Sequence, residues 1–244
     1  MSGMEKPGEL KPLRVLFDNS LYYFANDDDL VVNSVPVEVG GVAATIRIAQ
    51  VEPREFKDWR GNERQALREL CELARRGEIE FCTSTELYGE LSDSRESWRP
   101  GRTGNEMLEG IEFEFLDSPV ERTRFFSGVG FGAKKDRLDF CQFLRTLASA
   151  QQSPCWLGRF DGQLPERQKS GLADVGRFSE LCTGLSDDDE KMIDMFHLWT
   201  GEFSKVDYFL TFDRKLINFV NQTSKVEVRC SPISPYQLLQ KLRT

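Results

Sequence analysis

The chain has 244 residues, 39% of them hydrophobic and 30% charged, with a formal net charge of −8 at pH 7. This composition suits one sizeable folded domain and argues against a protein that coats nucleic acid nonspecifically, although local basic patches can still hold phosphates. No apolar run approaches the length of a membrane span and the first residues have no apolar signal core, so we expect a cytoplasmic protein with no membrane partner.

The histidine and cysteine content limits the possible chemistry. His197 is the only histidine, and the six cysteines are scattered singly, without a C-x-x-C pair. Catalytic zinc sites mostly use more than one histidine, and scattered cysteines indicate buried, reduced thiols rather than a disulfide framework. Metal chemistry in this chain must therefore use oxygen ligands, which favour Mg²⁺ or Mn²⁺.

The hydrophobic pattern predicts strands that alternate with helices. The first half predicts a strand at 13–17, a hairpin at 35–51 that turns at Gly40-Gly41, a helix at 62–76, a strand at 79–82 and a helix at 84–91. The second half predicts a strand at 111–116, helices at 135–149 and 187–203, a strand at 207–211, a helix at 214–221, a strand at 225–229 and a helix at 234–243.

This alternation predicts a three-layer α/β/α domain around a central, mostly parallel sheet. The strand at 13–17 should be central, flanked by the strands at 79–82 and 207–211. We interpret residues 1–244 as a single domain that carries the hairpin at 35–51 as an insertion. Residues 92–186 form an extended middle segment, within which 151–186 is expected to be irregular because it is rich in Gln, Ser, Gly and Pro.

Acidic residues follow two of the predicted strands. Asp18 ends the apolar run at 13–17, and Asp213 follows the strand at 207–211. Asp194 lies in the predicted helix before that second strand. Since ligands of open α/β sheets bind at the carboxyl ends of the strands, these carboxylates indicate a site for a divalent metal.

Four sequence motifs together resemble the PIN domain, a family of metal-dependent nucleases. They are a strand that ends in Asp, a Ser/Thr-led helix that carries Glu, a helix that begins at Asp, and a strand followed by Thr-x-Asp. In this chain they read R-V-L-F-D-N-S, C-T-S-T-E-L-Y-G-E-L, D-M-F-H-L-W-T and D-Y-F-L-T-F-D. The resemblance covers roughly 13–91 and 187–231, and it implies a PIN-like fold and Mg²⁺ or Mn²⁺ as cofactor.

The resemblance also implies roles for individual residues, with Asp18, Glu90, Asp194 and Asp213 as the catalytic acids. Asp18 and Asp213 would bind the metal, Asp194 would bind the metal or one of its waters, and Glu90 would orient or deprotonate the attacking water. Asn19 and Thr211 would hold these acids by hydrogen bonds. The implied activity is endonucleolytic hydrolysis of single-stranded RNA.

Several neighbouring residues admit two interpretations. Glu86 lies one helical turn before Glu90, which we prefer because it stands six residues after Ser84. Asp187 and Glu190 fit an acidic helix N-terminus but share a stripe with Asp194, so either is a possible auxiliary ligand through water. We expect His197 to be a packed, structural imidazole rather than a metal ligand.

The stretch from 122 to 137 mixes basic residues with phenylalanine and glycine. Bases stack on aromatic rings while Arg and Lys meet phosphates, so this stretch is a candidate RNA-binding segment. The alternative is a loop whose phenylalanines anchor it to the core. The basic residues that we single out for substrate binding are Arg122, Arg124, Lys134 and Lys135.

Two other functions remain open. A catalytically inactive PIN-fold binding or regulatory module would keep the fold without cleaving RNA. A haloacid-dehalogenase-like phosphatase also begins with a strand and Asp, but it needs a second Asp two positions later, where this chain has Ser20. The expected partners are RNA and possible protein partners, such as an antitoxin or a second copy in a homo-oligomer.

Overall fold

The computed structural model describes residues 11–26, 28–53, 55–93, 106–125, 133–150, 162, 164–185, 191–222 and 225–244. Within these residues, no helix is both long and apolar enough to cross a membrane.

A parallel sheet of five strands forms the centre of the fold, as the alternating pattern predicts. β1 lies in the middle and pairs with β4 on one side and with β6 on the other. The spatial order is β5 (Phe113–Leu116), β4 (Ile79–Ser84), β1 (Leu13–Phe17), β6 (Tyr208–Leu210) and β7 (Ser231–Ile233). All five carboxyl ends therefore meet at one edge of the sheet.

Each face of the sheet is covered by its own hydrophobic cluster. In β1, Leu16 points into one cluster, and Val15 and Phe17 point into the other. This is the period of two expected for a strand buried on both sides. The chain is therefore layered as helices, sheet and helices, the predicted three-layer α/β/α architecture.

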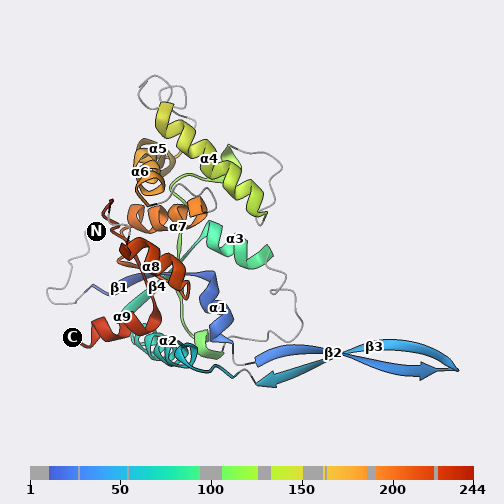
Figure 1. Ribbon diagram of the computed structural model, residues 1–244. Coiled ribbons are helices and arrows are strands. Elements are labelled where there is room, and N and C mark those ends of the chain that lie inside the picture. Colours follow the sequence, from blue (N-terminus) through green and yellow to red (C-terminus); the bar gives the residue numbers. More distant parts are fainter. Residues whose placement is uncertain are drawn as a thin grey trace.

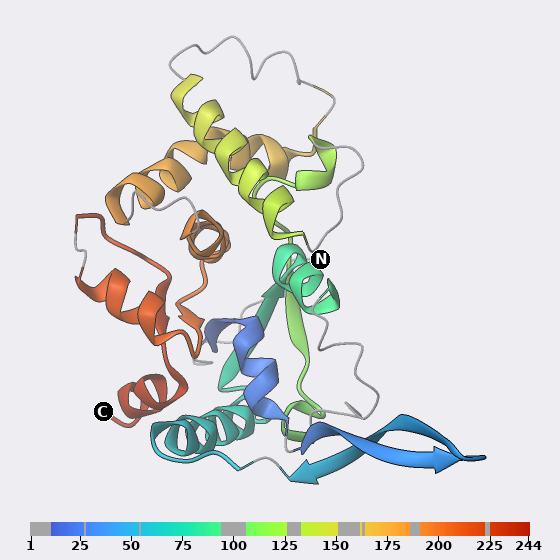
Figure 2. The ribbon, with the colours of Figure 1, turned by 45° about the vertical axis from the view of Figure 1, so that its right-hand side comes forward.

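The helices divide between the two faces according to the cluster that they enter (Figures 1 and 2). The cluster with Val15 and Phe17 receives α1 (Asn19–Ala25), α2 (Trp59–Arg75), α9 (Pro235–Leu242) and the short 3₁₀ helix Glu106–Leu108. The cluster with Leu16 receives α3 (Thr85–Asp93), α4 (Lys134–Ala150), α5 (Glu166–Ala173), α6 (Val175–Leu185), α7 (Met192–Phe203) and α8 (Arg214–Gln222).

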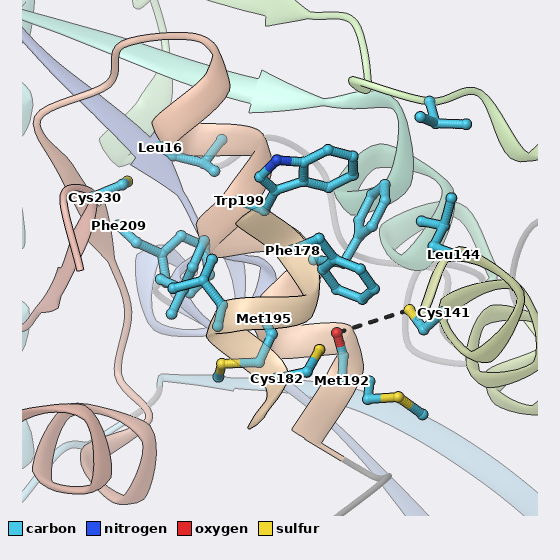
Figure 3. Packing of buried hydrophobic residues seen from close by; sticks show 14 of the residues in the cluster. Leu16, Cys141, Leu144, Phe178, Cys182, Met192, Met195, Trp199, Phe209 and Cys230 are labelled. Carbon is cyan, nitrogen blue, oxygen red and sulfur yellow. Dashed lines mark hydrogen bonds between the residues drawn. The ribbon is translucent and has the colours of Figure 1, made fainter. Parts of the chain in front are cut away.

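The cluster with Leu16 is rich in aromatic and sulfur-containing side chains (Figure 3). Trp199 of α7 lies at its centre, with the ring of Phe178 from α6 at 5.5 Å between centroids. Cys141 of α4 donates a hydrogen bond to the backbone oxygen of Met192 over 3.7 Å. These contacts fix α7, which carries Asp194 and His197, between the sheet and the helices of the middle segment.

The hairpin of β2 (Asp28–Val39) and β3 (Val42–Pro53) is longer than the predicted 35–51 and projects from the rest of the molecule (Figures 1 and 2). Its two strands pair antiparallel along their whole length. Gly40 and Gly41 have φ values of 59° and 77°, the conformation that a two-residue hairpin turn requires. The hairpin forms a sheet of its own, separate from the central one.

Two local predictions were wrong. The segment 151–186, expected to be irregular, contains α5 and α6, while its residues 151–161, 163 and 186 lie outside the described part. The predicted strand at 225–229 is not one in its described residues, and the fifth strand of the sheet follows it as β7. Val226 and Val228 instead pack against the hydrophobic cluster, so their alternation reflects burial rather than strand pairing.

Candidate active site

Asp18 lies directly after the central strand, where its carboxylate is held by two hydroxyl groups. Its backbone N–H donates to the oxygen of Leu210 over 3.0 Å, which continues the pairing of β1 with β6. Oδ2 of Asp18 accepts hydrogen bonds from Ser20 Oγ at 2.5 Å and from Thr211 Oγ1 at 2.7 Å. The predicted contact between Thr211 and the acids is therefore present, and it leaves Oδ1 without a bond to another described residue.

Asp213 lies beyond β6 and caps α8. Its Oδ1 accepts hydrogen bonds from the backbone N–H groups of Lys215 at 2.8 Å and Leu216 at 3.0 Å. Its own N–H donates to Thr211 Oγ1 over 3.0 Å, so one threonine hydroxyl links the Asp18 and Asp213 segments. Such a cap satisfies backbone donors at the start of the helix and fixes the carboxylate while its second oxygen stays open.

Glu90 of α3 is held by three side chains. Asn19 donates from Nδ2 to Oε2 over 3.2 Å, and His197 Nε2 lies 3.2 Å from Oε1. The guanidinium of Arg137 from α4 reaches the same Oε1 at 2.9 Å. Asn19 thus touches Glu90, one of the predicted acids, and its side chain has no hydrogen bond to Asp18 among the described residues.

The carboxylate of Asp194 on α7 has no hydrogen bond or ion pair with another described residue. Burial, together with the negative charges of Asp18, Asp213 and Glu90, raises its pKa to about 6 against the opposing effect of His197. These interactions place Asp18, Asp213 and Glu90 within electrostatic reach of Asp194. Asp18, Glu90, Asp194 and Asp213 thus form an electrostatic cluster at the carboxyl edge of the sheet, in which Thr211 links Asp18 to Asp213.

Burial and neighbouring groups also shift the pKa values of Asp18, Glu90 and His197. Burial raises the pKa of Asp18, against the effect of the hydrogen bonds from Ser20 and Thr211. Burial opposes ionisation of Glu90, but His197, Arg137 and Asn19 outweigh it and leave the pKa of Glu90 lowered. Burial likewise lowers the pKa of His197, yet the negative charges of Glu90, Asp194 and Asp18 more than offset it and the net pKa is raised.

Glu86 forms a buried ion pair next to the cluster, and its pKa also responds to the charges of His197, Arg137 and Glu90. Its Oε2 lies 3.1 Å from a guanidinium nitrogen of Arg122, and both residues are almost fully buried. Burial raises the pKa of Glu86, which the charge of Arg122 opposes. Arg122 is only 2% exposed, so its position argues against the predicted contact with substrate phosphates and assigns it to the core beneath α3.

The remaining predicted residues have mixed positions. Lys134 and Lys135 are exposed on the first turn of α4, the helix that also carries Arg137. Arg124 pairs with Glu121 at 2.6 Å, which neutralises part of its charge. Asp187 and Glu190, the possible auxiliary acids, lie outside the described residues.

The oxygen-rich chemistry of the cluster fits a hydrated hard cation better than a closed protein cage. Across the described ranges, no three His, Cys, Asp or Glu side chains are arranged to hold a metal ion among themselves. Mg²⁺ needs fewer than three protein ligands, because it is commonly bound through one or two carboxylates and keeps several waters. In addition, the buried Oδ1 of Asn19 has no hydrogen-bond partner in the described structure, which leaves an oxygen acceptor free beside the acids.

Three site residues were missed or undervalued by sequence reasoning. Ser20 received no role in binding Asp18, although a hydroxyl two residues after an aspartate is a local signal for such a bond. Arg137 meets Glu90 from 47 residues away, and His197 meets it from 107 residues away. No local pattern reports contacts of that sequence separation.

The arrangement therefore gathers several carboxylates at one edge of the sheet, with exposed lysines on the helix that carries Arg137. No protein-family model, curated protein or solved structure matches the chain.

Proposed function

We propose that this protein is a metal-dependent endoribonuclease of the PIN type, which hydrolyses phosphodiester bonds of single-stranded RNA. The observation that supports this most directly is that Asp18 and Asp213 are joined through the Thr211 hydroxyl, with Asp194 and Glu90 within electrostatic reach. These acids come from four separate elements of the chain. Concentrating negative charge in this way disfavours the free protein, and a bound cation offsets that cost.

In this proposal Asp18, Asp194 and Asp213 hold Mg²⁺ or Mn²⁺ with water completing the coordination. Asp18 and Asp213 each use one carboxylate oxygen for internal hydrogen bonds and keep the other available. Asp194 has no protein partner among the described residues, which suits a ligand whose partner is the ion. Such an ion would polarise the phosphodiester, lower the pKa of a bound water and offset charge on the leaving oxygen.

The protein groups around the acids have distinct tasks. Ser20 and Thr211 fix the rotamer of Asp18, so that its free oxygen keeps one direction. Glu90 is held ionised by His197 and Arg137, and it orients the attacking water by accepting a hydrogen bond from it. Lys134 and Lys135 attract the negatively charged backbone of the substrate toward this edge of the sheet.

The five described cysteines are free and buried, which suits a reducing compartment, and we propose the cytoplasm as the place of action.

One observation favours a second candidate, a PIN-fold binding module without catalysis. The carboxylate of Glu90 already has two cationic partners, Arg137 and His197, which supply from the protein part of the positive charge that a metal would bring. A binding module would keep the contacts of Glu90 with Arg137 and His197 as a structural link between α3, α4 and α7. It would bind RNA or a protein partner with no requirement for metal.

Cleavage of an end-labelled single-stranded RNA distinguishes the two candidates. The wild type should cleave in Mg²⁺ or Mn²⁺ and lose activity in EDTA, and Asp18→Asn should be inactive under all conditions. Asp139→Asn, the same chemical change at an exposed position on α4, is the matched control and should cleave like the wild type. Metal-independent cleavage, or none by a folded wild-type protein, would favour the binding module or a contaminating nuclease over our proposal.

A further inference from the structure

A cavity of about 420 Å³ lies between the starts of α2, α8 and α9. Arg214 begins α8 just after β6, and Ser234 precedes α9 just after β7. Because β6 and β7 are parallel, both residues lie at the carboxyl edge of the sheet, the edge that carries the acidic cluster. The volume is in the range of cavities that bind small molecules.

One wall of this cavity is an aromatic ring stacked with arginine. The guanidinium of Arg214 lies 4.9 Å from the centroid of Trp59, and that of Arg60 lies 5.5 Å from it. Trp59 is still 36% exposed despite these contacts. Aromatic rings and guanidinium planes are the two protein surfaces on which unpaired bases stack.

Hydrogen-bonding side chains also line the cavity. Asn62 of α2 and Asn218 of α8 line it, and neither amide bonds to another described residue. Amide groups donate and accept at once, as the edges of nucleobases do. Tyr236 adds a second aromatic ring that is 47% exposed.

The cavity is directly linked to the proposed active site through the chain. Asp213 and Arg214 are consecutive, and the cap that Asp213 places on α8 fixes both. Phe212, just before them, stacks on Phe24 of α1 with 3.8 Å between ring centroids. A ligand seated against Arg214 is therefore next to a rigidly held acid of the cluster.

We propose that this cavity binds one unpaired nucleobase of the single-stranded RNA substrate, stacked on the Trp59–Arg214 pair, beside the nucleotide that is cleaved. The inference rests on the proposed nuclease function for its substrate and adds where the RNA strand is held. The positive charge of Arg214 meets the phosphate of the bound nucleotide, and Asn62 and Asn218 meet the edge of its base.

The second described cavity, of about 490 Å³, does not have this character. It lies at the other end of α2, where Arg76 pairs with Glu78 and Arg243 pairs with Glu69. Its charges are thus neutralised within the protein, and none of its lining residues is an aromatic. It supplies a control site on the same helix.

The test measures the binding of short oligouridylate and oligoadenylate RNAs by fluorescence anisotropy. The buffer contains EDTA, so that cleavage does not interfere. Trp59→Ala and Arg214→Ala should each weaken binding by roughly 5- to 100-fold, the usual effect of removing a base-stacking partner. Trp59→Phe should retain most of the affinity because it keeps an aromatic face. Arg76→Ala, which removes a guanidinium from the second cavity, should bind like the wild type. Thermal melts of every variant establish that the fold is intact.

An abasic oligonucleotide of the same length separates base recognition from phosphate attraction. We expect it to bind the wild type weakly and to be insensitive to Trp59→Ala. Equal binding of RNA by wild type and Trp59→Ala, or of abasic and normal strands by the wild type, would overturn the inference while leaving the nuclease proposal standing. If RNA binding depends on Trp59 but no metal-dependent cleavage is detected, the nuclease proposal is overturned and the base-binding site still stands.

Discussion

The imidazole Nε2 of His197 lies 3.2 Å from Oε1 of Glu90, and the guanidinium of Arg137 reaches the same oxygen at 2.9 Å. The His197 side chain is 4% exposed and that of Glu90 is 20% exposed. This contact joins α3, α4 and α7, so one carboxylate connects the middle segment of the chain to the site. It also makes the charge of the only histidine a determinant of stability.

We expect the free energy of unfolding to fall as pH rises through the titration of His197. The pKa of His197 is raised in the folded protein, so its contribution is fully present below the unfolded value of about 6.5 and is lost above the folded value. Urea unfolding of wild type and His197→Gln from about pH 6 to pH 9 measures this effect. The wild type should lose stability over this range and the variant should show a flatter profile. Parallel profiles would mean that His197 is neutral when folded.

Asp194→Asn should stabilise the metal-free protein at neutral pH. The folded pKa of Asp194 is about 6, above the ordinary value of 3.8, so ionisation costs the native state free energy as pH rises between these values. Removing the charge should raise the free energy of unfolding by about 1–2 kcal/mol above pH 6, after allowance for screening by solvent. The gain should disappear below about pH 4, where Asp194 is protonated in both states.

Chemical denaturation in EDTA, at neutral pH and below about pH 4, measures the difference in stability between the wild type and Asp194→Asn. Asp139→Asn, at an exposed position, is the control and should change stability little at either pH. A destabilised Asp194→Asn protein at neutral pH would show that the carboxylate has a favourable partner in the free protein.

The buried pair of Glu86 and Arg122 should behave as a single unit. Replacing one partner, as in Arg122→Met, leaves an uncompensated buried charge and should cost about 3–5 kcal/mol. The double variant Glu86→Leu/Arg122→Met should be less destabilised than the sum of the two single variants, because no charge is left alone. A double-mutant cycle from urea unfolding gives the coupling, and additive effects would contradict the buried pairing.

Much of the framework was predictable because it depends on local pattern. The apolar run 13–17 becomes β1 with the predicted boundaries, at the predicted central position between β4 and β6. Acids that follow parallel strands must meet at one edge, so the grouping of Asp18 with Asp213 also follows from pattern and topology. The link between them through Thr211 was expected only from the resemblance of the Thr-x-Asp motif to the PIN domain.

What the sequence did not reveal depends on distant contacts. In α5 and α6 the apolar residues are interrupted by Gly, Ser and Thr, and these helices are stabilised by the packing of α6 against α4 and α7 and of α5 against α6. In 225–229 the alternation of Val226 and Val228 is typical of a strand, yet the sheet takes its edge strand from the following residues. Pro232 is tolerated in that strand because it lies at the edge, where one side of the backbone needs no partner.

The prediction for Arg122 was also wrong because of a contact between residues that are distant in the sequence. Arg122 looks like a surface cation in a segment rich in Arg, Gly and Phe, but it is drawn into the core by Glu86 from 36 residues away. Charge pattern along a sequence predicts how many cations a segment has, not which of them are paired.

The last prediction concerns Asp18 and the metal. Burial raises the pKa of Asp18, so Asp18→Asn removes an unfavourable buried charge, while the amide oxygen can still accept from Ser20 and Thr211. In EDTA the variant should therefore melt at the same temperature as the wild type or higher. In Mg²⁺ or Mn²⁺ the wild type should gain stability as the metal concentration rises, and the variant should gain less because it lacks one anionic ligand. Melting curves across a metal titration measure this, with Asp139→Asn expected to follow the wild type at every concentration. Equal metal stabilisation of wild type and Asp18→Asn would remove Asp18 from the metal site, and no stabilisation of either by any divalent ion would remove the metal from the proposed function.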